Sequence, residues 1–208
     1  MLKRPKKKKA VILDRDGVIN EMVYNPEFGT IDSPLNPEEF KLLPGVAKAN
    51  KLFKKIGFLV IIASNQPAVA KGKMGLELLA EIDKKMKREL AKGGAHLDGI
   101  YYCLHHPDAS QVKVKKYLKN CNCRKPKPGL ILKAVKELNI DLSKSYMIGD
   151  GLTDIEAGKR AGCKTIFLGN LKNYWCEAME KRKIKPDFVA KNLLEAVKII
   201  KQGKGHNT

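Results

Sequence analysis

Short apolar runs alternate with longer segments of helical periodicity along this chain, and this alternation constrains the fold more than any other feature. The runs are almost wholly apolar, which is typical of strands in a parallel sheet whose two faces are both covered. Strands are expected at residues 10–13, 58–63, 98–104, 145–148 and 163–168. Helices are expected at residues 45–55, 75–92, 129–138, 154–161, 172–183 and 192–201. The pattern predicts an α/β fold, a Rossmann-like open and mostly parallel sheet with helices on both faces.

No linker divides the 208 residues, so we expect one domain at residues 10–201, without a large cap domain. A basic arm at 1–9 and a disordered tail at 202–208 would flank it. Two proline-containing segments, 21–44 and 103–128, fit neither strand nor helix. Loops of this length in a compact domain are usually functional or tied down, so each segment is expected to be one or the other.

The chain is strongly basic, with 41 Lys and Arg against 22 Asp and Glu and a formal net charge of +19. Clustered cations are typical of nucleic-acid binding. Here, however, six of them lie within residues 3–9, and few aromatic residues lie among the others to stack on bases. A lysine-rich solvated surface that attracts small anionic metabolites is the favoured interpretation.

The basic start of the chain resembles that of a signal peptide, but the apolar run behind it, 10–13, is too short for a signal core. No stretch approaches the length of about 18 apolar residues that predicts a membrane span. We therefore expect a cytoplasmic protein that does not enter a membrane.

Polar residues directly follow three of the predicted strands, in segments 14–17, 64–66 and 149–151. The carboxyl ends of parallel strands share one edge of a sheet, and ligands of open α/β sheets bind there. The pattern therefore predicts one shared site. Carboxylates from two strands, Asp14 and Asp150 among them, would form a hard oxygen site suited to Mg²⁺, and the hydroxyl and amide of 64–66 would hold phosphate oxygens.

Each of these segments also has a simpler explanation when taken alone. Asp-Arg-Asp-Gly at 14–17 suits a turn, or the start of a calcium loop, although such a loop needs Asp or Asn where Val18 stands. Residues 64–65 would also satisfy backbone groups at a strand end, and Asp150 suits a turn. Residues 153–156 have the spacing of a capping box, which predicts a helix start just after Asp150. Only their common order after three apolar strands favours a site.

Residues 11–20, Val-Ile-Leu-Asp-Arg-Asp-Gly-Val-Ile-Asn, resemble the first motif of the haloacid dehalogenase (HAD) superfamily of phosphatases. Residues 64–66 (Ser-Asn-Gln) resemble its second motif and 124–126 (Arg-Lys-Pro) its third. Residues 149–154 (Gly-Asp-Gly-Leu-Thr-Asp) resemble its fourth. The resemblance covers most of the chain and implies a phosphatase with a Rossmann-like fold.

The resemblance implies that Asp14 attacks phosphorus in line and forms an aspartyl-phosphate, which divides one difficult displacement into two easier ones. Asp16 would protonate the leaving oxygen and later take a proton from the hydrolytic water. Mg²⁺ would be held by the carboxylates of Asp14 and Asp150 and by the backbone carbonyl of Asp16. It would orient the phosphate and neutralise charge that otherwise repels the nucleophile.

The resemblance also implies roles for residues around the transferring phosphate. Ser64 and Asn65 would bind its oxygens, and Lys125 would stabilise the charge of the transition state. Arg124, with its planar fork of donors, would grip a phosphate or a sugar hydroxyl of the substrate. Asp154 would support the site from behind the metal ligands.

Three of the five cysteines lie close together in the second long loop. Cys103-X-His105 and Cys121-X-Cys123 supply one nitrogen and three sulfur ligands, a closed tetrahedral set suited to structural zinc. The alternative is an ordinary loop with reduced thiols, and spacing alone does not decide between His105 and His106. Residues 101–107 and 121–126 resemble the zinc-bearing loop of one HAD subgroup, and that resemblance favours His105.

A closed zinc site leaves no position for substrate, so its expected task is mechanical: it would fix the loop that leads into the third motif. The other two cysteines, Cys163 and Cys176, are expected to be buried small apolar residues.

The zinc-loop subgroup contains D-glycero-D-manno-heptose 1,7-bisphosphate phosphatases and histidinol-phosphate phosphatases. The resemblance favours the heptose 7-phosphate as substrate, with histidinol phosphate as the alternative. The chain departs from the heptose pattern at Pro67-Ala68, at Gly151 and in the longer segment 21–43, which bears on the substrate and not on the reaction. We expect a monomer acting on a small phosphorylated metabolite. A hypothesis of another class is a zinc-containing nucleic-acid-binding module, which would be indifferent to Asp14→Asn and would bind with steep salt dependence.

Overall fold

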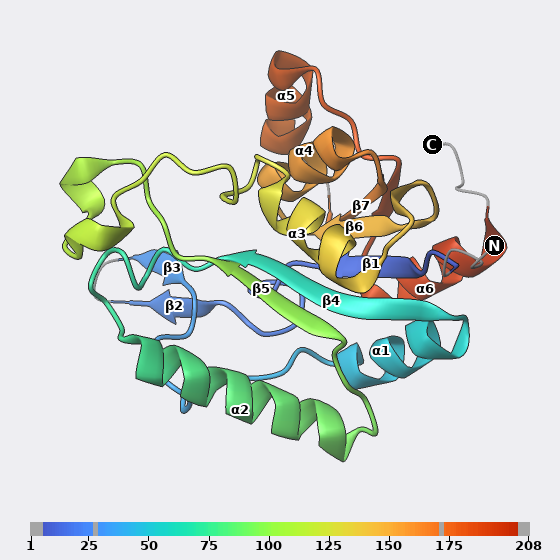
Figure 1. Cartoon of the computed structure of the whole chain (residues 1–208), viewed down its shortest axis with the longest axis horizontal. Helices are drawn as coiled ribbons and strands as arrows, with labels where there is room; N and C mark the ends of the chain where they lie inside the picture. Colours follow the sequence, from blue (N-terminus) through green and yellow to red (C-terminus); the bar gives the residue numbers. More distant parts are fainter. Residues whose placement is uncertain (1–5, 27–28, 171–172, 204–208) are drawn as a thin grey trace, which may run out of the picture.

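A six-stranded parallel sheet forms the centre of the protein in a computed structural model that describes residues 6–26, 29–170 and 173–203 (Figure 1). The strand order is β5-β4-β1-β6-β7-β8. The strands are β1 (Lys9–Leu13), β4 (Phe58–Asn65), β5 (Gly99–Cys103), β6 (Tyr146–Gly149), β7 (Lys164–Leu168) and β8 (Phe188–Ala190). The helices are α1 (Val46–Lys55), α2 (Leu76–Lys92), α3 (Gly129–Leu138), α4 (Leu152–Ala161), α5 (Asn173–Arg182) and α6 (Leu193–Gln202).

The helices cover both faces of the sheet, as Figure 1 shows. Successive strand residues point to opposite faces. Val11 and Leu13 of β1 pack in one apolar core with α1, α2 and α6. Ala10 and Ile12 pack in a second core with α3 and α4, and Phe167 of β7 carries a third, smaller cluster with α4 and α5. The Rossmann-like α/β fold expected from the sequence is therefore confirmed.

The expected strands and helices are all present, with boundaries that differ by at most two residues. The sequence missed β8 and a short antiparallel hairpin of β2 (Val23–Asn25) and β3 (Thr30–Asp32). Three-residue strands are too short to show an apolar pattern. Helix α4 begins at Leu152 with Gly151 as its N-cap, so the expected helix start just after Asp150 is confirmed. The capping box lies at 151–154 and not at 153–156, because Asp154 Oδ2 accepts a hydrogen bond of 3.1 Å from the amide of Gly151.

Both long loops are tied to the body by backbone contacts. The excursion that holds β2 and β3 leaves and returns at neighbouring points, because Asn20 forms a bridge with Leu42 and the amide of Glu21 donates to the carbonyl of Lys41 at 2.9 Å. In the second loop, His106 forms a bridge with Leu118, and the amide of Lys113 donates to the carbonyl of Ala70 outside the loop at 3.1 Å.

The ends of the chain are more ordered near the sheet than expected. Lys9 opens β1, and Lys8 pairs beside Ile140, so these two residues belong to the fold and not to a basic arm. Helix α6 extends to Gln202. Residues 1–5 of the expected arm and 204–208 of the expected tail lie outside the described residues. Among the helices that the structure describes, none has the length and apolar character needed to cross a membrane.

Candidate active site and metal centres

The three polar segments that follow β1, β4 and β6 meet at one edge of the sheet. β1 lies between the other two strands, with Leu13 paired to Ile62 on one side and to Ile148 on the other. Asp14 continues this pairing, because its amide donates to the carbonyl of Ile148 at 3.0 Å. The topology thus places Asp14 between the segment with Ser64 and the segment with Asp150.

Three carboxylates and one ammonium gather around this point. Asp14, Asp150 and Asp154 each offer an oxygen within 4.8 Å of the others. The Nζ atom of Lys125 lies 2.9 Å from Asp14 Oδ1 and 2.5 Å from Asp154 Oδ1. Lys125 is only 3% exposed and Asp154 1%, so this ion pair is screened little by water. Lys125 is thereby held against the predicted nucleophile.

Gly17 provides the space in which Asp150 lies. Its φ is +79°, a left-handed conformation that glycine adopts readily. A Cβ atom at this position would come within 2.1 Å of Asp150 Oδ2. The glycine of the first motif is therefore needed both for its backbone conformation and for the close approach of the Asp150 carboxylate.

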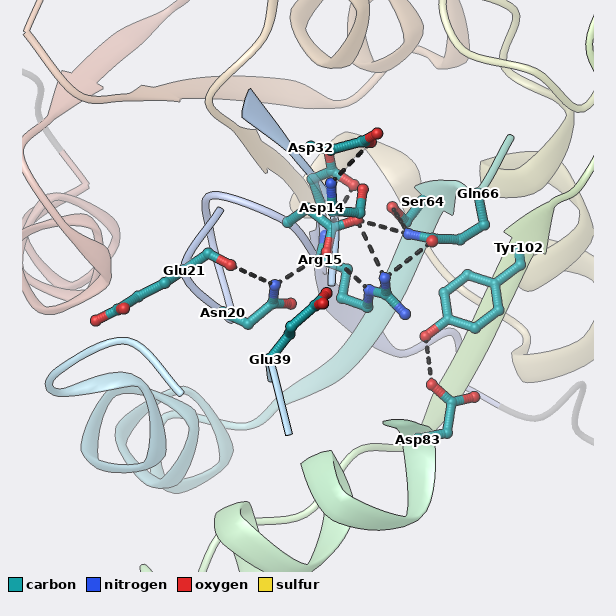
Figure 2. Close-up of polar contacts among 12 residues, drawn as sticks. Asp14, Arg15, Asn20, Glu21, Asp32, Glu39, Ser64, Gln66, Asp83 and Tyr102 are labelled. Carbon is teal, nitrogen blue, oxygen red and sulfur yellow. Dashed lines mark hydrogen bonds and ion pairs between the residues drawn. The ribbon is translucent and has the colours of Figure 1, made fainter. Parts of the chain in front are cut away.

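The side chain of Asp16 points into a different polar network, together with Arg15, which is fully buried. Arg15 donates to both oxygens of the Asp16 carboxylate and to the amide oxygen of Gln66. Asn20 and Gln66 also donate to Asp16. Figure 2 shows Arg15 between Asn20 on one side and Gln66 and Tyr102 on the other. No role was predicted for Arg15 or Gln66 from the sequence. A charged residue between two predicted catalytic aspartates was nevertheless a signal that pointed to Arg15.

The second and third motifs also meet directly. The Asn65 side chain forms two hydrogen bonds with the backbone of Lys125: Oδ1 accepts from its amide at 3.0 Å and Nδ2 donates to its carbonyl at 3.1 Å. Ser64 is buried beside Gln66, whose Nε2 donates to its Oγ at 3.2 Å. Arg124 is half-buried and donates to the carbonyl of His105 at 3.2 Å. The roles of Ser64, Asn65 and Arg124 toward a phosphate or sugar stay predictions.

Cys103, His105, Cys121 and Cys123 form a compact cluster in the second long loop, with ligand atoms within 4.8 Å of one another. The sulfur of Cys123 lies 3.0 Å from that of Cys121 and 3.2 Å from that of Cys103, and 3.4 Å from His105 Nδ1. His106 lies apart from the cluster, where its Nδ1 accepts from the amide of Asp108 at 3.2 Å.

The two cysteines outside this cluster differ in solvent exposure. Cys163 is buried, as expected, but Cys176 on α5 is exposed, so the expectation that it is a buried apolar residue was wrong.

Sequence comparisons agree with this geometry. A family model described as HAD-hydrolase-like matches residues 122–196. A D-glycero-beta-D-manno-heptose-1,7-bisphosphate 7-phosphatase of Photorhabdus laumondii is 41% identical over 160 residues, which cover 76% of this chain and 79% of that protein. A Pasteurella multocida protein with the same name is 35% identical, over 93% of this chain and 97% of its own. The chain belongs to the HAD-like hydrolases.

A solved structure supports the same assignment for this HAD-like hydrolase. It is the D,D-heptose 1,7-bisphosphate phosphatase of B. bronchiseptica complexed with magnesium and phosphate. It has a TM-score of 0.75 and 28% identity, and the match covers 94% of this chain and 99% of that one. The family and the enzyme class expected from the sequence, a HAD phosphatase, are confirmed.

The charge balance of the HAD-like hydrolase site suits a divalent cation. One ammonium, that of Lys125, faces three carboxylates, which leaves two negative charges. Burial and the nearby Asp14 carboxylate raise the pKa of Asp150 to about 6. Burial also raises the pKa of Asp154, although Lys125 opposes that effect. A cation between these carboxylates would relieve the repulsion, and an all-oxygen donor set is the one that Mg²⁺ prefers. Since Lys125 and the amide of Gly151 occupy both oxygens of Asp154, the carboxylates of Asp14 and Asp150 are the freer ligands.

The thiol cluster of this HAD-like hydrolase suits zinc. Zinc–sulfur distances of about 2.3 Å in a tetrahedron place sulfurs about 3.8 Å apart. The three sulfurs here lie 3.0, 3.2 and 3.5 Å from one another, so they need only a small outward shift to surround the ion. Burial raises the pKa of Cys103 above its ordinary value, and a bound cation would favour its thiolate form. Three sulfurs and one imidazole nitrogen fill a tetrahedral site and leave no position for water or substrate.

Proposed function

We propose that this HAD-like hydrolase removes the 7-phosphate of D-glycero-D-manno-heptose 1,7-bisphosphate, with Asp14 as nucleophile and Mg²⁺ and structural Zn²⁺ as cofactors. The observation that carries the proposal is the convergence of Lys125, Asp150 and Asp154 on Asp14 at the carboxyl edge of the sheet. Relatives of 35–41% identity carry the name of this activity, and they match this chain over most of their own length.

In the first half of the proposed reaction, an oxygen of Asp14 forms a bond to phosphorus while the bond from phosphorus to the sugar oxygen breaks. Asp16 gives its proton to that leaving oxygen, so the sugar departs as an alcohol. Lys125 Nζ, 2.9 Å from Asp14 Oδ1, holds the attacking carboxylate in place and stabilises charge on the transferring group. When bound, Mg²⁺ would be held by Asp14, Asp150 and the carbonyl of Asp16 and would lower the repulsion between carboxylate and phosphate.

In the second half, water attacks the aspartyl-phosphate and transfers a proton to Asp16. The bond between phosphorus and Asp14 breaks, which returns the carboxylate and releases inorganic phosphate. Asp16 ends the cycle protonated, as it began. Ser64 and the remaining amide hydrogen of Asn65 would hold the phosphate oxygens through both steps.

The proposed zinc site would act on the third motif through the backbone. Cys123 directly precedes Arg124 and Lys125, and the side chain of Asn65 holds the backbone of Lys125 from the opposite side. The loop after the second motif is also tied to the zinc loop, because the amides of Lys113 and Val114 both donate to the carbonyl of Ala70. The zinc site on one side and Asn65 on the other would thus fix the backbone of Lys125, so that its ammonium group keeps its place beside Asp14.

The finer details belong to the same proposal. The enzyme would act as a cytoplasmic monomer on a small phosphorylated metabolite, within a single domain. Histidinol phosphate is the second candidate substrate, because Pro67-Ala68 and Gly151 depart from the heptose pattern beside the site.

A substrate panel with an Asp14→Asn control tests the proposal. The protein would be incubated with Mg²⁺ and each ester, and released phosphate measured. The panel holds both anomers of heptose 1,7-bisphosphate, fructose 1,6-bisphosphate, histidinol phosphate and a 3′-phosphorylated oligonucleotide. We expect the heptose ester to lead and the variant to be silent. A lead by another ester would refute the substrate assignment. Equal inertness of both proteins, with salt-dependent binding of the oligonucleotide, would favour the nucleic-acid-binding module.

A further inference from the structure

Arg15 is an arginine without solvent exposure, located between the two aspartates of the first motif. Charged side chains are almost never fully buried unless they are paired, because desolvation of the charge is costly. The partner of Arg15 is Asp16, and the reaction steps described above leave this arginine without a task. Its contacts indicate what that task is.

The guanidinium of Arg15 grips the Asp16 carboxylate with two donors. Nε lies 3.1 Å from Oδ1 and Nη2 lies 3.3 Å from Oδ2. Asn20 Nδ2 donates to Oδ1 at 3.0 Å, and Gln66 Nε2 donates to Oδ2 at 2.6 Å. Each carboxylate oxygen therefore accepts from Arg15 and from one neutral amide. A planar fork with two contacts fixes the plane of a carboxylate, which a single donor cannot do.

Other side chains in turn hold the guanidinium of Arg15 in place. Its Nη2 also donates to Gln66 Oε1 at 2.8 Å, so Gln66 bridges the arginine and the aspartate. The ring of Tyr102 on β5 faces the guanidinium, with its centroid 5.5 Å from the central carbon. The Tyr102 hydroxyl in turn donates to Asp83 Oδ1 on α2 at 2.7 Å, a contact that Figure 2 shows below the ring. The fork therefore has support from the residue directly after β4, from β5 and from α2.

We propose that Arg15 is the positioning residue of Asp16: its fork fixes the plane of the Asp16 carboxyl group, and one of the four contacts is exchanged when Asp16 carries the proton to the leaving oxygen. The inference rests on the proposed function, in which Asp16 is the general acid and base. Proton transfer requires the donor oxygen within hydrogen-bond reach of the leaving oxygen, and a misplacement of about 1 Å can reduce a rate about 10²-fold. Arginine keeps its own protons, so Arg15 acts only through Asp16.

A purely structural role for the same ion pair makes a different prediction. Loss of a structural contact would lower stability and reduce the rate on every substrate alike. Loss of a positioned general acid affects only those esters whose leaving group needs a proton. Sugar alkoxides need one, whereas p-nitrophenolate leaves readily as the anion.

The test compares kcat/KM for heptose 1,7-bisphosphate and for p-nitrophenyl phosphate in Arg15→Met. This ratio reports steps up to departure of the leaving group, before the water step that both esters share. We expect a loss of about 10²-fold for the sugar ester and of less than about threefold for the aryl ester. Arg15→Lys, which keeps the charge and loses the fork, should lie between Arg15→Met and wild type. Lys54→Met is the matched control: it breaks the ion pair with Asp98 near the opposite end of β4 and should leave the ratio of the two substrates unchanged.

A double variant guards against a folding defect. In Asp16→Asn no carboxylate is left unpaired when Arg15→Met is added, so the double variant should remain folded by circular dichroism. If Arg15 acts through Asp16, adding Arg15→Met to Asp16→Asn should change single-turnover p-nitrophenol release and sugar-ester cleavage by less than about twofold. Equal losses on both esters in Arg15→Met, or a further large loss in the double variant, would overturn the positioning role while the phosphatase stands. An inactive wild-type protein would instead overturn the proposed function, and the positioning role with it.

Discussion

The two candidate metal centres differ in what holds their ligands. Asp14 and Asp150 follow β1 and β6, two adjacent strands of the central sheet, so the fold itself keeps their carboxylates close despite the repulsion between them. The four ligands of the thiol cluster come from the end of β5 and from a long loop with only short 3₁₀ turns. The sheet holds the first site without a cation, whereas the loop site would depend on a bound cation to fix its geometry. Removal of Mg²⁺ should therefore stop the chemistry and spare the fold, and removal of Zn²⁺ should loosen the loop first.

Asp14→Asn should give the largest change in activity at the sheet site. We expect loss of phosphate release by at least about 10⁴-fold, because no carboxylate remains to attack phosphorus. The unfolding temperature should be unchanged or higher, since one of three mutually repelling carboxylates loses its charge. Steady-state kinetics and thermal unfolding would check both parts. A large fall in the unfolding temperature would show that the sheet does not hold the site as rigidly as the comparison requires.

Cys123→Ser should act mainly on the loop site. We expect loss of bound zinc, faster proteolysis within residues 103–128, and a fall in kcat of about 10²-fold as Lys125 shifts. Metal analysis, limited proteolysis and kinetics would measure these effects. Cys176→Ser, at an exposed cysteine outside the cluster, is the matched control and should retain zinc and activity. Full activity in a zinc-free Cys123→Ser protein would show that the loop does not control the position of Lys125.

Asn65→Ala should separate the two centres at their point of contact. The change removes both hydrogen bonds to the Lys125 backbone but none of the thiol ligands. We expect kcat to fall about tenfold, with zinc content unchanged, because the loop stays folded while the lysine loses one support. A rise of KM alone, with kcat preserved, would indicate that Asn65 serves substrate binding and not the position of Lys125.

The smallest expected effect is a pH dependence of the metal-free protein. The pKa of Asp150 is raised to about 6 by burial and by Asp14, above the value of about 3.9 for an unfolded aspartate. The folded state therefore binds the proton of Asp150 more tightly than the unfolded state does. Ionised Asp150 lowers the free energy of unfolding above pH 6, and this free energy recovers as the pH falls from 6 to 4. Asp150→Asn should raise the unfolding temperature at pH 7 and flatten this part of the profile. Excess Mg²⁺ at pH 7 should stabilise the wild type and not the variant.

Much of this architecture could be predicted because its signals are local. An apolar run followed at once by Asp14, Ser64 or Asp150 shows both a buried strand and a polar group at its end, and parallel topology then brings those ends together. The spacing of the cysteines likewise predicted a metal site from local sequence alone. The structure brings His105 and not His106 to the sulfurs.

The contacts that could not be predicted join residues from distant parts of the sequence. Gln66, directly after β4, and Tyr102 on β5 contact Arg15, and Asp83 on α2 holds Tyr102. Nothing near any of them in sequence indicates that they share one network. The hydrogen bonds from Asn65 to the backbone of Lys125 depend on side-chain orientation, which apolar periodicity does not encode. The three-residue strands β2, β3 and β8 are too short for a periodic pattern, since pairing partners define them.

The backbone contact between Glu21 and Lys41 joins the two ends of the first long loop. Phe40 at its end is buried in the core, whereas the β2–β3 hairpin is largely exposed and forms the interchangeable part. The two ends of the loop are already joined, so the chain entropy of closing the loop changes only slowly with insert length, by about 0.6 kcal/mol for each doubling. A longer, shorter or unrelated insert could be grafted there without disturbing Asp14, which lies on the sheet side of the junction. The hairpin can therefore vary in length and sequence while the strand end that carries Asp14 keeps its structure.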